Sequence, residues 1–159
     1  MTQEKKQELT LRISQANKTE LITILYEMTH EYTKDAMTAL ENKDMVSFKE
    51  SLRVTRGCVK ELMLSLHYEH ELAMRFLEIY MFLNRELALA EARKKPEYLE
   101  HVLRIVQKLW DSYKELEKKD TSGPVMEHTQ QVYTGLTYGR DSLSVSSVPG
   151  QEANRGFTV

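Results

Sequence analysis

The side chains best able to do chemistry are few, and they lie apart along the chain of 159 residues. Glu27 and His30 form the one Glu-x-x-His pair in the predicted helices, a spacing with which ferritin-like bundles bind two metal ions. At 100° per residue both side chains fall away from the main apolar stripe of their helix, and no second such pair accompanies them. The pattern favours two solvated residues over a metal site.

The remaining candidates for catalysis or ligation lack the partners that such chemistry needs. His67 and His70 straddle a predicted helix break, and a lone pair of histidines more often serves the surface or a helix cap. Cys58 has no flanking cations and no motif that supplies a catalytic histidine. His30 with Lys34 lacks the glycine of a phosphotransfer site. The sequence therefore predicts no enzyme, no metal site and no cofactor.

The composition is that of a helical protein in a reducing compartment. Hydrophobic residues make up 41% and charged residues 29%, and five of the six glycines and all three prolines lie from Pro96 onward. A net charge of −2 without a basic face argues against nucleic acid and anionic membranes as partners. A single cysteine, a polar N-terminus and the lack of a long apolar run predict a cytoplasmic protein without a membrane span.

Helical periodicity predicts four helices within residues 17–119. The first begins at the cap Asn17, with Glu20 as its capping-box partner, and ends near "ENKD"; the second begins at Asp44 and breaks near "HYEH". The third ends on the cations of "RKK", and the fourth begins at Pro96. Short loops force sequence neighbours to run antiparallel. The predicted fold class is therefore all-α, an up-down-up-down four-helix bundle between an N-terminal segment, 1–16, and a mostly disordered tail, 120–159.

Two of these helices carry more apolar surface than one core-facing stripe requires. In the first helix a main stripe holds Leu25, and a second stripe about 100° away holds Ile22, Tyr26 and Met37. The fourth helix has a similar second stripe. Such a surface is either core or a groove for a partner helix, and periodicity alone favours core without separating the two. If it is a groove, Leu25 belongs to the core, whereas polar substitutions at Ile22 and Tyr26 leave stability nearly unchanged.

The chain from about residue 13 to 116 resembles the FliS family of flagellar export chaperones. The resemblance rests on the order and spacing of short motifs: "ELITILYEMTHEYTKDAMTALENKDM" with Glu20, Leu21 and Tyr26, a later Glu61-Leu62 followed by Leu66, "ELAMRFLEIYMFLNRELALA", and Trp110 in the fourth helix. The chain departs from the family at Asn17-Lys18, where Ser-Pro is usual, and it lacks an N-terminal tyrosine and the glycines between helices two and three. Its tail beyond Asp120 is long for the family.

The resemblance implies a helical bundle that binds the C-terminal segment of newly made flagellin in apolar grooves. It would prevent premature polymerisation and deliver flagellin to the flagellar type III export gate. Taken with the surplus stripes, it implies partner-binding residues at Ile22, Tyr26, Met37, Leu77, Tyr80, Leu99, Leu103, Val106 and Trp110. A non-flagellar helical adaptor, an anti-sigma-type binding module and a cryptic phosphotransfer or metal protein stay open as alternatives, and a homodimer is compatible with the sequence.

Overall fold

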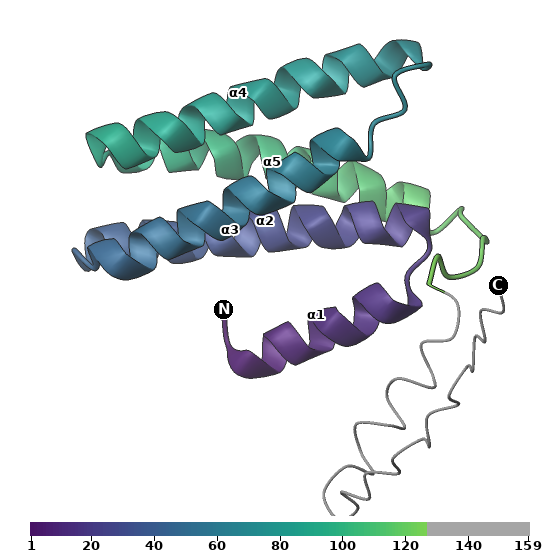
Figure 1. The fold of residues 1–159 in the computed structure, drawn as a ribbon, viewed down its shortest axis with the longest axis horizontal. Helices are drawn as coiled ribbons and strands as arrows, with labels where there is room; N and C mark the ends of the chain where they lie inside the picture. The colour runs from purple at the N-terminus through teal and green to yellow at the C-terminus, as the bar shows by residue number, and fades with distance from the viewer. Residues whose placement is uncertain (127–159) are drawn as a thin grey trace, which may run out of the picture. The chain divides into compact units, whose positions relative to one another are not determined.

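The structure, a computed structural model, describes residues 1–126, and this part of the chain is all-helical, with five helices and no strand. The disorder predicted for the tail lies, from residue 127 onward, outside the described residues. The helices are α1 (Gln3–Gln15), α2 (Lys18–Glu41), α3 (Met45–Leu64), α4 (Glu71–Arg93) and α5 (Pro96–Glu117) (Figure 1). The four predicted helices correspond to α2–α5, whereas α1 lies in the segment for which no helix was predicted.

Local signals set the helix starts where the sequence placed them. The Asn17 side chain accepts from the backbone N–H of Glu20 at 2.8 Å, and the Glu20 carboxylate accepts from the backbone N–H of Asn17 at 2.7 Å. Asp44 caps α3 by accepting from the Ser47 N–H, and Pro96 occupies the first turn of α5. Helix α4 starts after His70 without a side-chain cap, which agrees with the weak boundary signal there.

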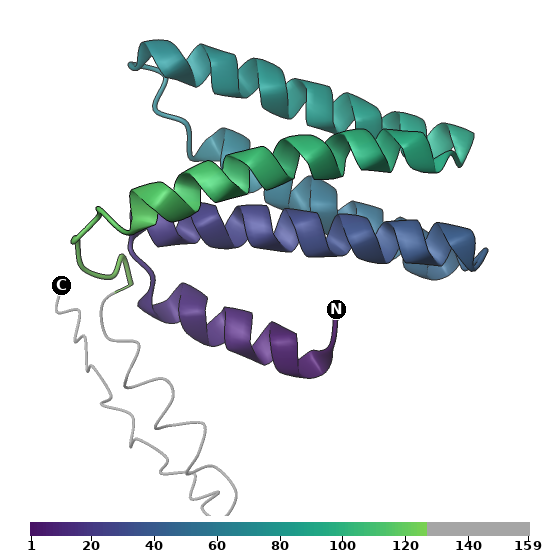
Figure 2. The same ribbon diagram turned by 180° about the vertical axis from the view of Figure 1, so that it is seen from behind.

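Helices α2–α5 form a helical bundle in which each helix packs against two others. Helix α2 lies against α3 and α5, and α4 packs against the same two helices (Figures 1 and 2). The connections at 42–44 and 94–95 are short, whereas residues 65–70 form a longer link between α3 and α4. Helix α1 packs against α2. Helix α2 therefore has three neighbours, more than any other helix in the described part of the chain.

The three neighbours of α2 account for both of its apolar stripes. The second stripe faces the bundle core: Tyr26, Thr29 and Thr33 have no exposed surface, and Ile22 and Met37 pack against the same core. Part of the main stripe faces α1, where Leu21 and Met28 pack on a small cluster of Leu9, Ala16 and Ile24. The preference for core over groove on the second stripe is thus confirmed along most of its length.

The prediction that Leu25 is core while Tyr26 is surface is wrong in this structure. Tyr26 is fully buried and its hydroxyl lies 2.6 Å from that of Tyr80 on α4. Leu25 is only partly buried at the edge of the same core. The two stripes looked equivalent in sequence because nothing local distinguishes a stripe that faces the bundle core from one that partly faces a single short helix.

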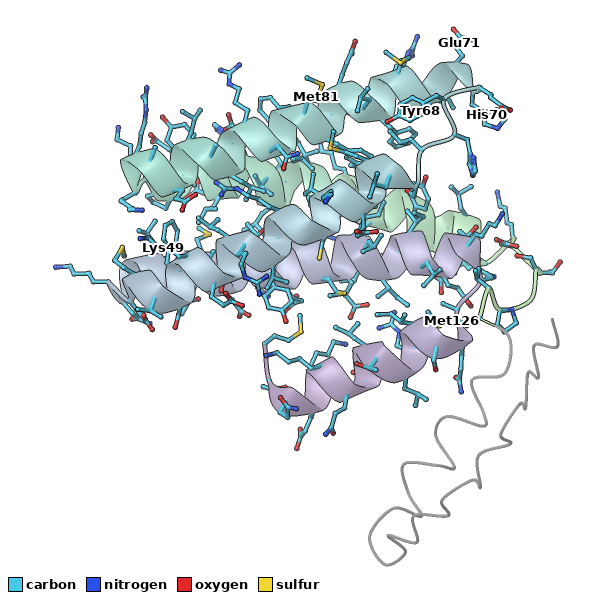
Figure 3. All side chains as sticks on the ribbon, in the orientation of Figure 1. Lys49, Tyr68, His70, Glu71, Met81 and Met126 are labelled. Carbon is cyan, nitrogen blue, oxygen red and sulfur yellow. The ribbon has the colours of Figure 1, made fainter. Side chains whose placement is uncertain are left out.

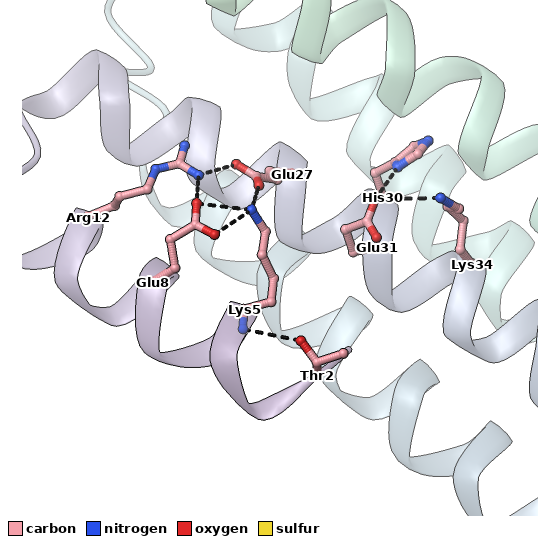
Figure 4. A network of polar contacts seen from close by, with 8 residues as sticks. All are labelled: Thr2, Lys5, Glu8, Arg12, Glu27, His30, Glu31 and Lys34. Atoms are coloured by element: carbon pink, nitrogen blue, oxygen red, sulfur yellow. Dashed lines mark hydrogen bonds and ion pairs between the residues drawn. The ribbon is translucent and has the colours of Figure 1, made fainter.

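Ion pairs between α1 and Glu27 of α2 hold the two helices together (Figure 4). Lys5 Nζ lies 2.8 Å from one carboxylate oxygen of Glu27, and Arg12 Nη1 donates to the other at 2.7 Å. Glu8 bridges the same two cations from α1. Hydrogen bonding to Glu27 raises the pKa of Lys5. The expectation of a solvated Glu27 is wrong, because the cations of α1 cover its carboxylate and leave it 6% exposed.

We predict that removing both cations by Lys5→Ala and Arg12→Ala will detach α1 while the rest of the bundle stays folded. A buried carboxylate that loses its partners is costly, and we expect α1 to lose about 1–3 kcal/mol of local stability. Amide exchange of residues 3–15 beside those of α3 measures this. Glu27→Gln should do less damage than the double variant, since it leaves no buried charge unpaired: Lys5 and Arg12 are partly exposed and still contact Glu8. Arg53→Ala, in an exposed pair with Glu50, is the control.

We also predict that Tyr26→Ser will destabilise the protein far more than Leu25→Ser. Tyr26→Ser empties a fully buried aromatic site and strands the Tyr80 hydroxyl, at a cost of about 3–5 kcal/mol. Leu25→Ser removes a partly buried side chain and should cost about 1–2 kcal/mol. Urea unfolding of both variants gives the comparison. Equal losses would show that Leu25 is as much a core residue as Tyr26.

Candidate partner-binding groove

An apolar groove opens at the end of the bundle where α3 ends and α4 begins. Its volume is about 910 Å³, and it is lined by residues of all five helices, of the 65–70 link and of the segment after α5. We call it the end groove and define it by its lining: Ile13, Lys18, Thr19, Leu21, Ile22, Ile24, Leu25, Glu61, Leu64, Ser65, Leu66, His67, His70, Leu72, Ala73, Phe76, Tyr80, Tyr113 and Val125. Figure 3 locates this end of α4 by the labels of Tyr68, His70 and Glu71.

The groove exists because helices diverge where their connection is long. Residues 65–70 separate the last turn of α3 from the first turn of α4, so these two helix ends lie apart. The ends of α4 and α5, in contrast, meet at the short connection 94–95 (Figure 1). Apolar side chains on both sides of this link therefore stay uncovered. Leu64 is 66% exposed and Leu72 is 60% exposed, although each lines the groove. Exposed large apolar side chains that gather in a hollow indicate a binding surface.

Aromatic rings form the inner wall of the end groove. The ring centroids of Phe76 and Tyr80 are 6.1 Å apart, and those of Phe76 and Tyr113 are 6.4 Å apart. Tyr113 is also 5.2 Å from Tyr26, which lies behind the lining. Burial raises the pKa of Tyr80 to about 12 and raises the pKa of Tyr26 and Tyr113 as well. These tyrosines are therefore neutral throughout the physiological range and offer hydroxyl groups rather than charge.

The residues that follow α5 fold back beside the groove. The backbone N–H of Val125 donates to the carbonyl of Ala16 at 2.9 Å, and the Asn17 amide donates to the carbonyl of Ser122 at 3.3 Å. The Thr19 hydroxyl donates to Asp120 at 2.5 Å. The sequence placed residues 120–126 in a disordered tail, but these bonds tie them to the junction of α1 and α2. Local sequence could not show this, because each bond joins residues more than 100 positions apart.

The structure brings only two of the nine predicted partner-binding residues to the end groove. Ile22 and Tyr80 line it. Leu99 and Val106 are fully buried in the bundle core, as is Tyr26. These three are thus core residues of the free protein rather than accessible contacts.

The other four predicted residues lie elsewhere on the bundle. Trp110 of α5 packs on His30 of α2, with ring centroids 5.5 Å apart, and Lys114 lies over its ring at 4.4 Å. Met37 packs against the core, and Leu77 and Leu103 are partly buried on α4 and α5. The nine residues therefore do not form one site.

Most of the lining could not be predicted from the sequence, because helical periodicity does not show which apolar residues stay uncovered in the folded bundle. Leu64 ends α3, Leu66 lies in the α3–α4 link, and Leu72 lies in the first turn of α4. Periodicity placed Leu66 and Leu72 on the apolar stripes of their helices, which predicts core rather than a groove. Phe76 lay on the single stripe of its predicted helix and Tyr113 on the second stripe of the fourth, and both are partly buried at the core's edge. A useful signal was present: large apolar residues stand on both sides of a link without glycine or proline.

The chemically reactive side chains do not converge. The rings of His67 and His70 are 6.4 Å apart at the exposed groove entrance, and burial raises the pKa of the Cys58 thiol to about 11. His30 is partly buried and contacts Glu31 at 3.2 Å. Within residues 1–126 no group of three or more histidine, cysteine or acidic side chains is placed to hold a metal ion. No helix in the same range is long and apolar enough to cross a membrane.

Comparison with known proteins identifies the family of the chain. No curated protein matches the chain. A family model described as "Flagellar protein FliS" matches residues 1–120, a range that includes all five helices. Because the match covers most of the chain, the protein belongs to the FliS family of flagellar proteins.

Proposed function

We propose that this protein is a cytoplasmic export chaperone that binds the C-terminal segment of flagellin in the end groove. The main support for this proposal is the end groove, which is open, largely apolar and lined on its inner wall by aromatic rings. Membership of the FliS family supports it as well. By covering the segment, the protein prevents premature polymerisation of flagellin, and it delivers flagellin to the flagellar export gate. It acts by binding and catalyses no reaction.

Helix-in-groove recognition supplies the driving force in this proposal. A disordered segment that folds as an amphipathic helix loses conformational entropy, and apolar burial must offset that loss. Leu64 and Leu72 are available for this burial because they are exposed in the free protein. Ile22 and Leu25 form the α2 side, and Phe76 the α4 side. The antiparallel up-down-up-down arrangement that we infer for α2–α5 holds these walls apart.

The residues outside the end groove have a secondary role in this proposal. Trp110, Leu103 and Leu77 would contact parts of the segment that run beyond the groove, and Met37 would support that surface. Tyr26, Leu99 and Val106 would act indirectly, by holding the wall residues in place. We expect one chaperone to bind one flagellin, and a homodimer of the free protein is compatible with this stoichiometry.

We predict that the protein binds full-length flagellin one-to-one and binds flagellin lacking its C-terminal segment much more weakly. Apolar burial in the groove requires that segment, so its removal takes away most of the contact surface. Isothermal calorimetry with the two flagellins measures both affinity and stoichiometry. Equal binding of the two would contradict the proposal and would favour a helical adaptor with another partner.

A matched pair of variants then tests the site itself. Leu72→Asp places a charge in the groove, and Val46→Asp places the same charge on an 81% exposed residue outside it. Each is the second residue of its helix, where aspartate is compatible with the helix dipole. We expect Leu72→Asp to weaken flagellin binding about tenfold or more, with little loss of stability, and Val46→Asp to bind as wild type does.

A further inference from the structure

The outer side of α4 carries large apolar side chains that no other helix of residues 1–126 covers. Helix α4 packs against α3 and α5 and lies at the edge of the bundle, on the side away from α1 (Figures 1 and 2). On this outer side Met74 is 55% exposed and Met81, labelled in Figure 3, is 58% exposed. The exposed Ala88 continues their line, because residues seven apart lie within about 20° of each other around a helix. Exposed methionines in line along a helix indicate a surface that packs on a partner.

Two opposite charges lie in the same line, one on each side of Met81. Glu78 and Arg85 are both exposed and are also seven residues apart, so they share one side of α4. Neither side chain forms a hydrogen bond or an ion pair within residues 1–126. We call this surface the α4 outer face and define it by its residues: Met74, Glu78, Met81, Arg85, Ala88 and Ala92.

We propose that the α4 outer face packs on the same face of a second copy of this chain, with the two α4 helices antiparallel. A two-fold axis between residues 81 and 82 places each residue opposite the one equally far beyond the axis. Glu78 of each copy then lies opposite Arg85 of the other, because both positions are equally far from the axis. Met81 meets its own equivalent, and Met74 faces small alanine side chains. The face is therefore complementary to itself in both charge and size.

The order of the charges favours this arrangement over a parallel one. In a parallel two-fold pair Glu78 would lie beside Glu78 and Arg85 beside Arg85, and like charges repel. The antiparallel pair also leaves the end groove free, since Leu72 and Phe76, its lining residues on α4, lie about 180° and 140° around the helix from Met81. The inference is thus independent of the proposed function. A contact of one helix per copy is small, so we expect a dimer that dissociates on dilution.

The test reverses the charges that the two-fold axis brings together. Arg85→Glu makes the α4 outer face acidic and Glu78→Arg makes it basic, so each variant alone places like charges opposite each other. In an equimolar mixture the acidic face of one variant meets the basic face of the other, which restores both pairs. Sedimentation velocity of the full chain over a range of concentrations measures the monomer and dimer fractions. Both positions are exposed, and circular dichroism checks that the variants fold. Lys49→Glu, a charge reversal on an exposed residue of α3, is the matched control.

We expect wild type to change from monomer to dimer between about 1 μM and 1 mM. Each single variant should dimerise about tenfold or more weakly than wild type, whereas the mixture and Lys49→Glu should dimerise as wild type does. A wild type that stays monomeric over this range would overturn the inference. Single variants that dimerise as well as wild type, or a mixture that stays monomeric, would overturn it too.

Discussion

Helix α2 must be covered by three neighbours at once, and the rest of the structure depends on this constraint. Its second stripe faces the core between α3 and α5, where the Tyr26 hydroxyl lies 2.6 Å from that of Tyr80 on α4. Part of its main stripe would be exposed without α1, which packs against Leu21, Ile24 and Met28. A helix with two apolar stripes is stable only when both are buried. The position of α1 and the packing of the bundle core therefore both follow from the two apolar stripes of α2.

The end groove is what remains uncovered when this packing is complete. The neighbours of α2 diverge at its first turns because residues 65–70 form a long link, and α1 covers only one flank. Ile22 and Leu25 are left as a wall there. The residues after α5 border the opening through their bonds to Ala16 and Asn17. The groove therefore follows from ordinary packing, which leaves it open at the end of the bundle where α3 ends and α4 begins.

The sequence allowed the helices to be predicted, because their signals are local. The capping box at Asn17, the cap at Asp44 and the proline at 96 lie within one turn of the helices they start. Helix α1 was missed because its sequence is polar and its attachment depends on Glu27, which is distant in sequence. The groove was found only in part for a similar reason. Its lining comes from the five helices, the α3–α4 link and the residues after α5, seven segments whose meeting depends on a loop length rather than on any stripe.

Site-specific photo-crosslinking is the most direct test of the claim that flagellin occupies the end groove. A photoreactive amino acid at Leu64, which is 66% exposed and lines the groove, should crosslink to the C-terminal segment of flagellin. The same amino acid at Val46, which is exposed outside the groove, should yield little product. Mass spectrometry identifies the linked peptide. Efficient crosslinking from Val46 with none from Leu64, or linkage of Leu64 to another part of flagellin, would contradict the account.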